Sequence, residues 1–184
     1  MHIGKSTKRH AKNFRISVDK CFNLVAKGCR NQHGTNCWLY PPLLQAYLAI
    51  HLNKLTNRGV SFHSFEVWNK DDKLVAGELG YAVGGAYTSL TGFSDASFAG
   101  NVQLHATGYL LRQLGFLMWD FGMHMKYKED LGAIEIPRKE FVARLTSLRD
   151  FRPRRLQCIL QEASAILANK TVEVLIYIYT YLCA

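Results

Sequence analysis

The sequence lacks several features that would assign it to a common class of protein. Its five cysteines are odd in number and none is spaced Cys-x-x-Cys, so neither a zinc site nor a disulfide framework is predicted. Its seven histidines include no His-x-x-x-His pair, which argues against a metal site. No apolar segment of signal-peptide type opens the chain, and the longest apolar run, at 172–182, is too short to span a membrane. These absences predict a cytoplasmic protein with no metal and no membrane partner.

Acidic residues are scarce at the start of the chain. Residues 1–30 hold eight Lys and Arg side chains against one acid, Asp19, whereas residues 31–184 hold 15 against 13. A basic arm over residues 1–13 predicts a polyanionic partner, and nucleic acid before a membrane surface, because no amphipathic apolar face accompanies it. A solvated leader or an acid-poor presequence is the alternative.

Hydrophobic periodicity predicts one α+β domain over residues 14–150. Apolar residues recur at helical spacing in some segments and alternate with a period of two in others. Short turns between the three central strands are typical of an antiparallel meander with helices around it. In chain order we expect an unstructured arm at 1–13, a strand at 14–18, a helix capped by Ser17 or Asp19 with Phe22, Val25, Ala26 and Cys29 on one face, a helix at 41–57, strands at 60–68, 73–83 and 86–93, a helix at 99–114, a strand at 116–121 and a helix from Pro137.

The tail at 151–184 follows this pattern less clearly. Residues 154–170 could form a helix, and residues 172–182 could form a strand that would promote aggregation if it were unpaired. The second segment is either a last strand of the domain or a sequence foreign to it.

The expected order of strands and helices resembles the core of the acyl-CoA N-acyltransferase (GNAT-like) fold. That fold has a mixed, mainly antiparallel sheet flanked by helices, and its acyl donor binds where two strands splay apart. The place of its glycine-rich CoA loop reads FSDASFAGN in this chain and lacks the pattern of that loop. The resemblance therefore implies acyl transfer with a donor other than CoA.

Five strings make the resemblance more specific: KNFRISVDKCF, WLYPPLLQAYLAIH, HSFEVW, LVAGELGYAVGG and LGAIEIPRKEF. In this order they resemble successive blocks of the leucyl/phenylalanyl-tRNA–protein transferases, over about residues 2–148. The resemblance implies a Leu/Phe-like amino acid moved from aminoacyl-tRNA to the N-terminal amine of a protein that begins with Arg or Lys, which marks that protein for degradation. It implies no cofactor and no metal. By the same resemblance, we expect the chain to lack the smaller N-terminal domain of the family.

The resemblance also assigns catalytic roles. Asp120 matches the Asp of a family Asp-x-Gln motif and would accept or orient a proton of the acceptor amine, whereas Gly122 stands where the family has Gln. A Gly-Glu-Ser-Met-Phe block of the family reads SLTGF here, with Leu90 in place of the Glu and Phe93 at its end. Glu78, which the family pattern does not have, is a second catalytic candidate that could replace the lost acid. The alternative is a Glu78 side chain that faces solvent on an alternating strand.

Further residues are expected to contact substrate or tRNA. Trp38 matches a tryptophan near the terminal adenosine, and Glu66 is retained. Thr107 and Leu111 stand where two aromatics shape the donor side-chain pocket of the family. With Phe93 and Gly122, these residues are the expected substrate contacts. The expected contacts to tRNA phosphates are Lys5, Lys8, Arg9, Lys12, Arg15, Arg138 and Lys139.

Two other functions remain open. The Gly122 and Leu90 differences favour a catalytically inactive tRNA-binding relative, and the fold alone is compatible with an N-acyltransferase that uses another donor.

Overall fold

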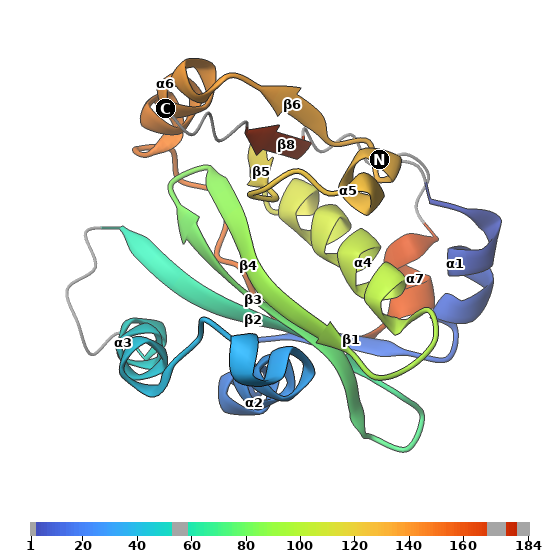
Figure 1. Ribbon diagram of the computed structural model, residues 1–184. Coiled ribbons are helices and arrows are strands. Elements are labelled where there is room, and N and C mark those ends of the chain that lie inside the picture. Colours follow the sequence, from blue (N-terminus) through green and yellow to red (C-terminus); the bar gives the residue numbers. More distant parts are fainter. Residues whose placement is uncertain (1–2, 53–58, 169–175, 180–184) are drawn as a thin grey trace.

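A computed structural model describes residues 3–52, 59–168 and 176–179 (Figure 1). Its centre is an eight-stranded sheet in the order β6-β8-β5-β4-β3-β2-β1-β7. Helices cover both faces of this sheet. The elements in chain order are α1 (Lys5–Ala11), β1 (Arg15–Val18), α2 (Phe22–His33), a 3-10 turn (Gly34–Asn36), α3 (Pro41–His51), β2 (Val60–Trp68), β3 (Leu74–Val83), β4 (Ala86–Ser94), α4 (Ala99–Gln113), β5 (Met118–Asp120), α5 (Lys126–Asp130), β6 (Ile134–Ile136), α6 (Arg138–Leu148), β7 (Cys158–Glu162), α7 (Ala163–Leu167) and β8 (Ile176–Tyr179).

The sheet is antiparallel from β7 to β4 and parallel from β4 to β6. Strands β2, β3 and β4 form the meander that the sequence predicted, and tight turns join them. This is an α+β architecture with a mostly antiparallel open sheet flanked by helices, so the predicted fold class is confirmed.

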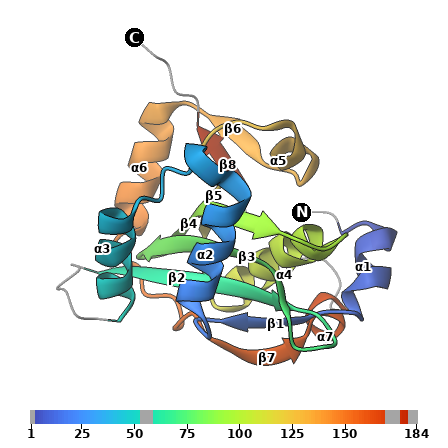
Figure 2. The same ribbon diagram turned by 60° about the horizontal axis from the view of Figure 1, so that its bottom comes forward.

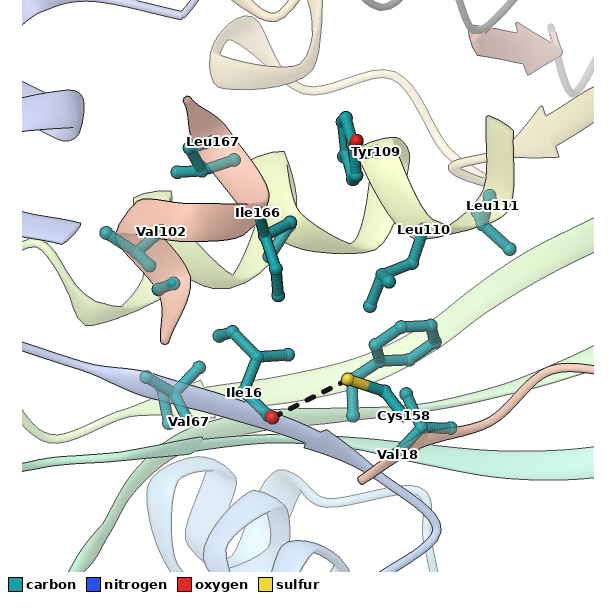
Figure 3. Close-up of a cluster of buried hydrophobic side chains, with 14 of the residues drawn as sticks. Ile16, Val18, Val67, Val102, Tyr109, Leu110, Leu111, Cys158, Ile166 and Leu167 are labelled. Carbon is teal, nitrogen blue, oxygen red and sulfur yellow. Dashed lines mark hydrogen bonds between the residues drawn. The ribbon is translucent and has the colours of Figure 1, made fainter. Parts of the chain in front are cut away.

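Each face of the sheet has its own hydrophobic core. Helices α2 and α3 pack on one face, and α4 packs on the other together with α7 (Figures 1 and 2). On the α4 face, Ile16 of β1, Leu111 of α4 and Leu167 of α7 are at most 1% exposed (Figure 3). The thiol of Cys158 lies in the same cluster and donates to the Ile16 carbonyl oxygen at 3.7 Å. Strand β7 and helix α7 are thereby bound into the core.

Most of the predicted elements are confirmed. Strand β2 has the predicted bounds, and β3, β4 and α4 differ from theirs by one residue. Helix α2 buries the predicted face of Phe22, Val25, Ala26 and Cys29. Its cap is not the predicted Ser17 or Asp19, because Cys21 takes that position and no side chain caps the helix. Helix α3 ends at His51, and the rest of the helix expected to residue 57 lies largely outside the described residues.

The expectation of an unstructured arm is wrong for α1. Thr7 and Ala11 of this helix are buried at 6% and 0% exposure. The His10 ring stacks on Phe98 with the ring centroids 3.8 Å apart. The lysines and arginine of α1 are exposed, so the charge and the apolar contacts of this segment occupy different sides of one short helix.

The tail is also more ordered than the sequence indicated. A single helix over 154–170 is wrong, because β7 pairs with β1 and is followed by α7, whose Ala163 and Ile166 are buried. Residues 176–179 form β8 between β5 and β6, and the remainder of the predicted strand at 172–182 lies outside the described residues. The described tail therefore supplies the edge strand β7 at one end of the sheet and the internal strand β8 near the other end. No helix in the described ranges is long and apolar enough to cross a membrane.

Candidate functional site

The first site lies where strands β4 and β5 separate. Ala86, Tyr87 and Thr88 of β4 pair in parallel with β5, whose last residue is Asp120. Strand β4 then continues to Ser94, whereas the chain after Asp120 turns away at Gly122. Gly122 has a φ of +67°, a left-handed conformation that glycine adopts at little cost. A buried carboxylate therefore lies at the point where two parallel strands separate.

Asp120 is buried, at 4% exposure, and each of its carboxylate oxygens accepts one hydrogen bond. Thr88 Oγ1 donates to Oδ2 at 3.0 Å, and the Gly122 N–H donates to Oδ1 at 2.7 Å. Burial raises the pKa of the Asp120 carboxyl, although the two hydrogen bonds and the charge of Lys128 oppose this shift. The carboxylate is therefore a stronger base than an exposed aspartate.

The turn after Asp120 is held by Lys128 of α5, a residue that no sequence pattern marked as part of the site. This lysine is 8% exposed, and its Nζ donates to the Phe121 carbonyl oxygen at 2.5 Å and to that of Met123 at 2.7 Å. Burial lowers the pKa of Lys128, while the nearby Asp120 charge acts in the opposite direction. Lys128 lies in a run of basic residues, and residue type alone does not distinguish a buried lysine from its exposed neighbours. The sequence therefore gave no indication that Lys128 is buried.

Glu78, the second catalytic candidate, is buried rather than solvent-facing. It is 3% exposed and accepts hydrogen bonds from the Tyr87 hydroxyl at 3.2 Å and from Ser89 Oγ at 3.1 Å. Trp119 Nε1 donates in turn to Ser89 Oγ at 3.0 Å. Burial raises the pKa of Glu78 to about 7, against the hydrogen bonds that it accepts. The solvent-facing alternative is wrong.

The sheet places Glu78 and Asp120 on opposite faces. Asp120 is bonded to Thr88 and Glu78 to Ser89, and neighbouring residues of one strand point to opposite faces. Glu78 therefore does not stand beside Asp120 as a replacement for the lost family acid. Period-two alternation within each strand could not predict that the two carboxylates face opposite sides, because the register between β4 and β5 is set by tertiary pairing.

The buried Glu78 predicts a pH-dependent stability. Its folded pKa lies above the ordinary value of 4.5, so the protonated form stabilises the fold below pH 4.5 and this contribution is lost as the pH rises through about 7. Glu78→Gln keeps the shape without the charge. We expect the variant to gain stability relative to wild type between pH 5 and pH 8, by on the order of 3 kcal/mol. Urea unfolding of both proteins at the two pH values measures this difference, and parallel pH profiles would contradict the assignment.

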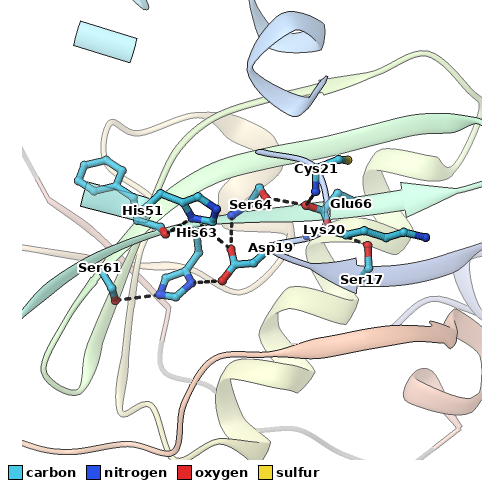
Figure 4. Close-up of polar contacts among 10 residues, drawn as sticks. Ser17, Asp19, Lys20, Cys21, His51, Ser61, His63, Ser64 and Glu66 are labelled. Atoms are coloured by element: carbon cyan, nitrogen blue, oxygen red, sulfur yellow. Dashed lines mark hydrogen bonds and ion pairs between the residues drawn. The ribbon is translucent and has the colours of Figure 1, made fainter. Parts of the chain in front are cut away.

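Glu66, an expected substrate contact, is fully engaged inside the protein (Figure 4). It is 0% exposed and accepts from Ser17 Oγ and Ser64 Oγ, each at 2.6 Å, and from the Cys21 N–H at 3.2 Å. Burial raises its pKa, and these hydrogen bonds oppose the shift. Through these hydrogen bonds Glu66 links β1, β2 and the start of α2, so its contacts stabilise the fold.

The other expected substrate contacts are separated by the sheet. Trp38 is 43% exposed, just before α3. Phe93 is buried under α2, where its ring faces Gly28 so closely that a Cβ there would lie 2.6 Å away. Thr107 and Leu111 are 0% exposed on α4, and Thr107 Oγ1 accepts from Gln103 Nε2 at 2.9 Å. The structure does not bring these four residues together, and their substrate roles stay predictions.

The expected tRNA contacts fall into three groups. Lys5, Lys8, Arg9 and Lys12 are exposed on or next to α1, and Arg15 pairs with Asp72 in the turn between β2 and β3. Arg138 and Lys139 are exposed at the start of α6, at the other end of the molecule from α1 (Figures 1 and 2). In the described part of the chain, no three His, Cys, Asp or Glu side chains are grouped to hold a metal ion.

Comparison with known proteins defines the family. The family model described as leucyl/phenylalanyl-tRNA protein transferase matches residues 1–146. A protein named leucyl/phenylalanyl-tRNA–protein transferase from Pelodictyon phaeoclathratiforme is 33% identical over 138 residues, which cover 73% of this chain and 66% of that protein. Relatives of the same name from Rubrobacter xylanophilus and Hyphomonas neptunium are 30% and 33% identical, over 79% and 78% of this chain.

The fold is an α+β architecture with a mostly antiparallel open sheet, and a buried carboxylate lies at the end of β5. The match over residues 1–146 shows that the chain belongs to the leucyl/phenylalanyl-tRNA protein transferase family. The chain spans 66%, 73% and 55% of the lengths of the three relatives named above.

Proposed function

We propose that this chain is an aminoacyltransferase that moves Leu or Phe from aminoacyl-tRNA to the N-terminal amine of an acceptor protein. The observation that carries the proposal is the position of Asp120 in a member of this family, buried at the end of β5 where β4 and β5 part. Acceptors that begin with Arg or Lys, and their degradation in the cytoplasm, are parts of the same proposal.

The proposed chemistry uses Asp120 as the base. The acceptor nitrogen attacks the ester carbonyl carbon, a C–N bond forms, and the C–O bond to the tRNA ribose breaks. Asp120 takes a proton from the attacking amine and returns it to the ribose oxygen as that oxygen leaves. Thr88 and Gly122 each occupy one carboxylate oxygen, so a further lone pair on each oxygen is open to the amine. A raised pKa brings the carboxylate closer to the range in which a general base is effective at neutral pH.

Access to Asp120 requires the segment after β5 to move. The carboxylate is 4% exposed, whereas Met123 and Met125 in the following segment are 61% and 46% exposed. We propose that these exposed methionines contact the Leu or Phe side chain of the donor, because the thioether chain adapts to differently shaped apolar groups.

Helix α1 is the proposed tRNA contact. Its basic side chains are exposed, and the buried Thr7 and Ala11 anchor it to the α4 face, so these charges are presented on a fixed support. A fixed row of cations releases counterions from a phosphate backbone on binding, which makes the affinity depend on salt.

Replacing Lys8, Arg9 and Lys12 by Ala is expected to flatten the salt dependence of tRNA binding. Each lost phosphate contact should lower the slope of log K against log salt by about one unit. Filter binding or fluorescence anisotropy between low and moderate salt measures the slope. Lys27→Ala with Arg30→Ala removes exposed charge from α2 on the other face and should leave the slope unchanged. Equal slopes for wild type and the α1 variant would remove α1 from the tRNA site.

Transfer of labelled amino acid tests the function itself. The 184-residue chain is incubated with tRNA charged with labelled Leu or Phe and with peptides that begin with Arg, Lys or Ala. The proposal expects label on the Arg and Lys peptides and little on the Ala peptide. Binding of charged tRNA without transfer would instead identify an inactive tRNA-binding relative. Acylation from another donor would identify a different N-acyltransferase.

A further inference from the structure

A second polar site lies on the α4 side of the sheet, apart from Asp120. It is a pocket of about 400 Å³ between the first half of β2 and the loop that leads to β7. This volume is within the range of small-molecule sites in proteins. The residues that line it include Asp19, Ser61 and His63, together with Arg152, Arg154 and Arg155.

Ser61, His63 and Asp19 form one hydrogen-bonded series (Figure 4). Ser61 Oγ lies 2.8 Å from His63 Nε2, and His63 Nδ1 lies 2.8 Å from Asp19 Oδ2. A carboxylate only accepts hydrogen bonds, so Nδ1 carries the imidazole proton and Nε2 accepts from the Ser61 hydroxyl. This is the geometry of a serine nucleophile with a histidine base and an orienting aspartate.

The chain holds each member of the series in place. Ser61 and His63 are two residues apart on β2 and therefore share one face of the sheet. Asp19 has a φ of +62°, a sparsely populated conformation for a residue other than glycine, and its Oδ1 accepts from the Ser64 N–H at 3.0 Å. His51 Nδ1 lies 3.8 Å from the same Oδ1 and 2.9 Å from the Phe62 carbonyl oxygen. The carboxylate is thus held by contacts from strand β2 and from the end of helix α3.

The charge of the lining indicates the class of ligand. Arg152, Arg154 and Arg155 line the pocket with one acid, Asp19, whose carboxylate already contacts His63. One guanidinium nitrogen of Arg152 and one of Arg154 donate to backbone carbonyl oxygens, and the other N–H groups have no such bond in the described residues. The guanidinium groups are donors for an anionic substituent or for an oxyanion that develops during acyl transfer. The His63 side chain is 11% exposed, so its base nitrogen is largely shielded from bulk water.

We propose that Ser61, His63 and Asp19 form a nucleophilic serine site that hydrolyses small carboxylic esters bearing a negative charge. Ser61 Oγ attacks the ester carbonyl carbon while His63 Nε2 takes the hydroxyl proton. The ester C–O bond breaks, and the alcohol leaves with the proton that His63 returns. His63 then takes a proton from a water molecule, whose oxygen attacks the acyl carbonyl carbon. The C–O bond to Ser61 breaks, Ser61 Oγ receives the proton from His63, and the carboxylic acid is released. Asp19 holds the imidazole and stabilises its protonated form.

This site does not share residues with the proposed transfer reaction. His63 pairs with Gly80, which is two residues from Glu78 on β3, so His63 faces the Glu78 side of the sheet. Asp120 faces the opposite side. The two proposals therefore stand or fall separately.

The test compares two chromogenic esters of similar size, anionic 4-nitrophenyl hydrogen succinate and neutral 4-nitrophenyl butyrate. Wild type is expected to release nitrophenolate and to prefer the succinate ester. A fluorophosphonate probe, located by mass spectrometry, is expected on Ser61. Ser61→Ala should abolish labelling, and His63→Gln should slow the release by about 10²–10⁴-fold. Arg152→Ala with Arg155→Ala should lower the rate for the succinate ester roughly tenfold and leave the butyrate rate unchanged.

The control is Ser97→Ala, which removes an exposed serine and should leave labelling and ester release as in wild type. Melting temperatures of all variants show whether any loss reflects unfolding, and Ser61→Ala removes only one hydroxyl. Equal ester release by wild type and Ser61→Ala, or a probe located on other residues, would overturn the proposal. Aminoacyl transfer by Ser61→Ala, measured in parallel, should equal that of wild type.

Discussion

Asp120→Asn is expected to lower the rate of aminoacyl transfer by about 10²–10⁴-fold, the usual contribution of general acid–base catalysis. Asparagine keeps the shape of the side chain, and its amide oxygen can accept one of the hydrogen bonds from Thr88 and Gly122. It cannot take a proton from the acceptor amine at neutral pH. Single-turnover transfer from charged tRNA, with tRNA affinity and melting temperature on the same sample, measures the effect.

Asp130→Asn is the matched control for this experiment. Asp130 lies on α5 in the same part of the molecule, but its side chain is 67% exposed and contacts Lys126. Its removal should change transfer little. If Asp120 only supports the turn at Gly122, Asp120→Asn should cost about 1 kcal/mol of stability and keep its turnover. That pair of results would exclude Asp120 as the base.

Leu167→Ala is expected to lower the free energy of unfolding by about 2–5 kcal/mol, because it leaves a cavity in the core. Leu167 is 1% exposed on α7 and packs in the cluster on the α4 face (Figure 3). The residue lies beyond the domain boundary at 150 that the sequence predicted. A large loss would show that the tail is part of the folding unit. Chemical denaturation monitored by circular dichroism gives the value.

Leu24→Ala makes the same chemical change at a residue that is 52% exposed on α2. We expect it to cost no more than about 0.5 kcal/mol. Similar small losses for both variants would mean that α7 contributes little to stability, and that residues 14–150 fold without it.

Much of the domain core was readable from its sequence because the signal is local. Strands β2, β3 and β4 alternate with a period of two and are joined by tight turns, so their existence and pairing follow from neighbouring residues. The predictions for the arm and the tail were wrong because local sequence signals do not report contacts with distant elements. The sequence of helix α1 is typical of a charged coil. Its two buried residues, Thr7 and Ala11, are covered because α1 packs on α4 and α7, which are distant in sequence.

The site could be predicted only in part. The sequence predicted that Asp120 lies near the end of a strand and that it matches the family motif. The structure adds the hydrogen bonds from Thr88 and Gly122. The inward turn of Lys128 gave no sequence signal. The series of Ser61, His63 and Asp19 was also missed, because Asp19 lies over 40 residues from the other two.

The sequence by itself determined the family, the antiparallel centre of the sheet and the basic charge of the first helix, because each rests on residue identity or short-range periodicity. Only the tertiary structure decided which carboxylates share a face. Side chains alternate along a strand, so the register of β4 against β5 sends Asp120 to one side of the sheet while Glu78 points to the other. Burial then set the pKa values of both groups, since the cost of charging a carboxyl depends on the surrounding side chains rather than on the residue type.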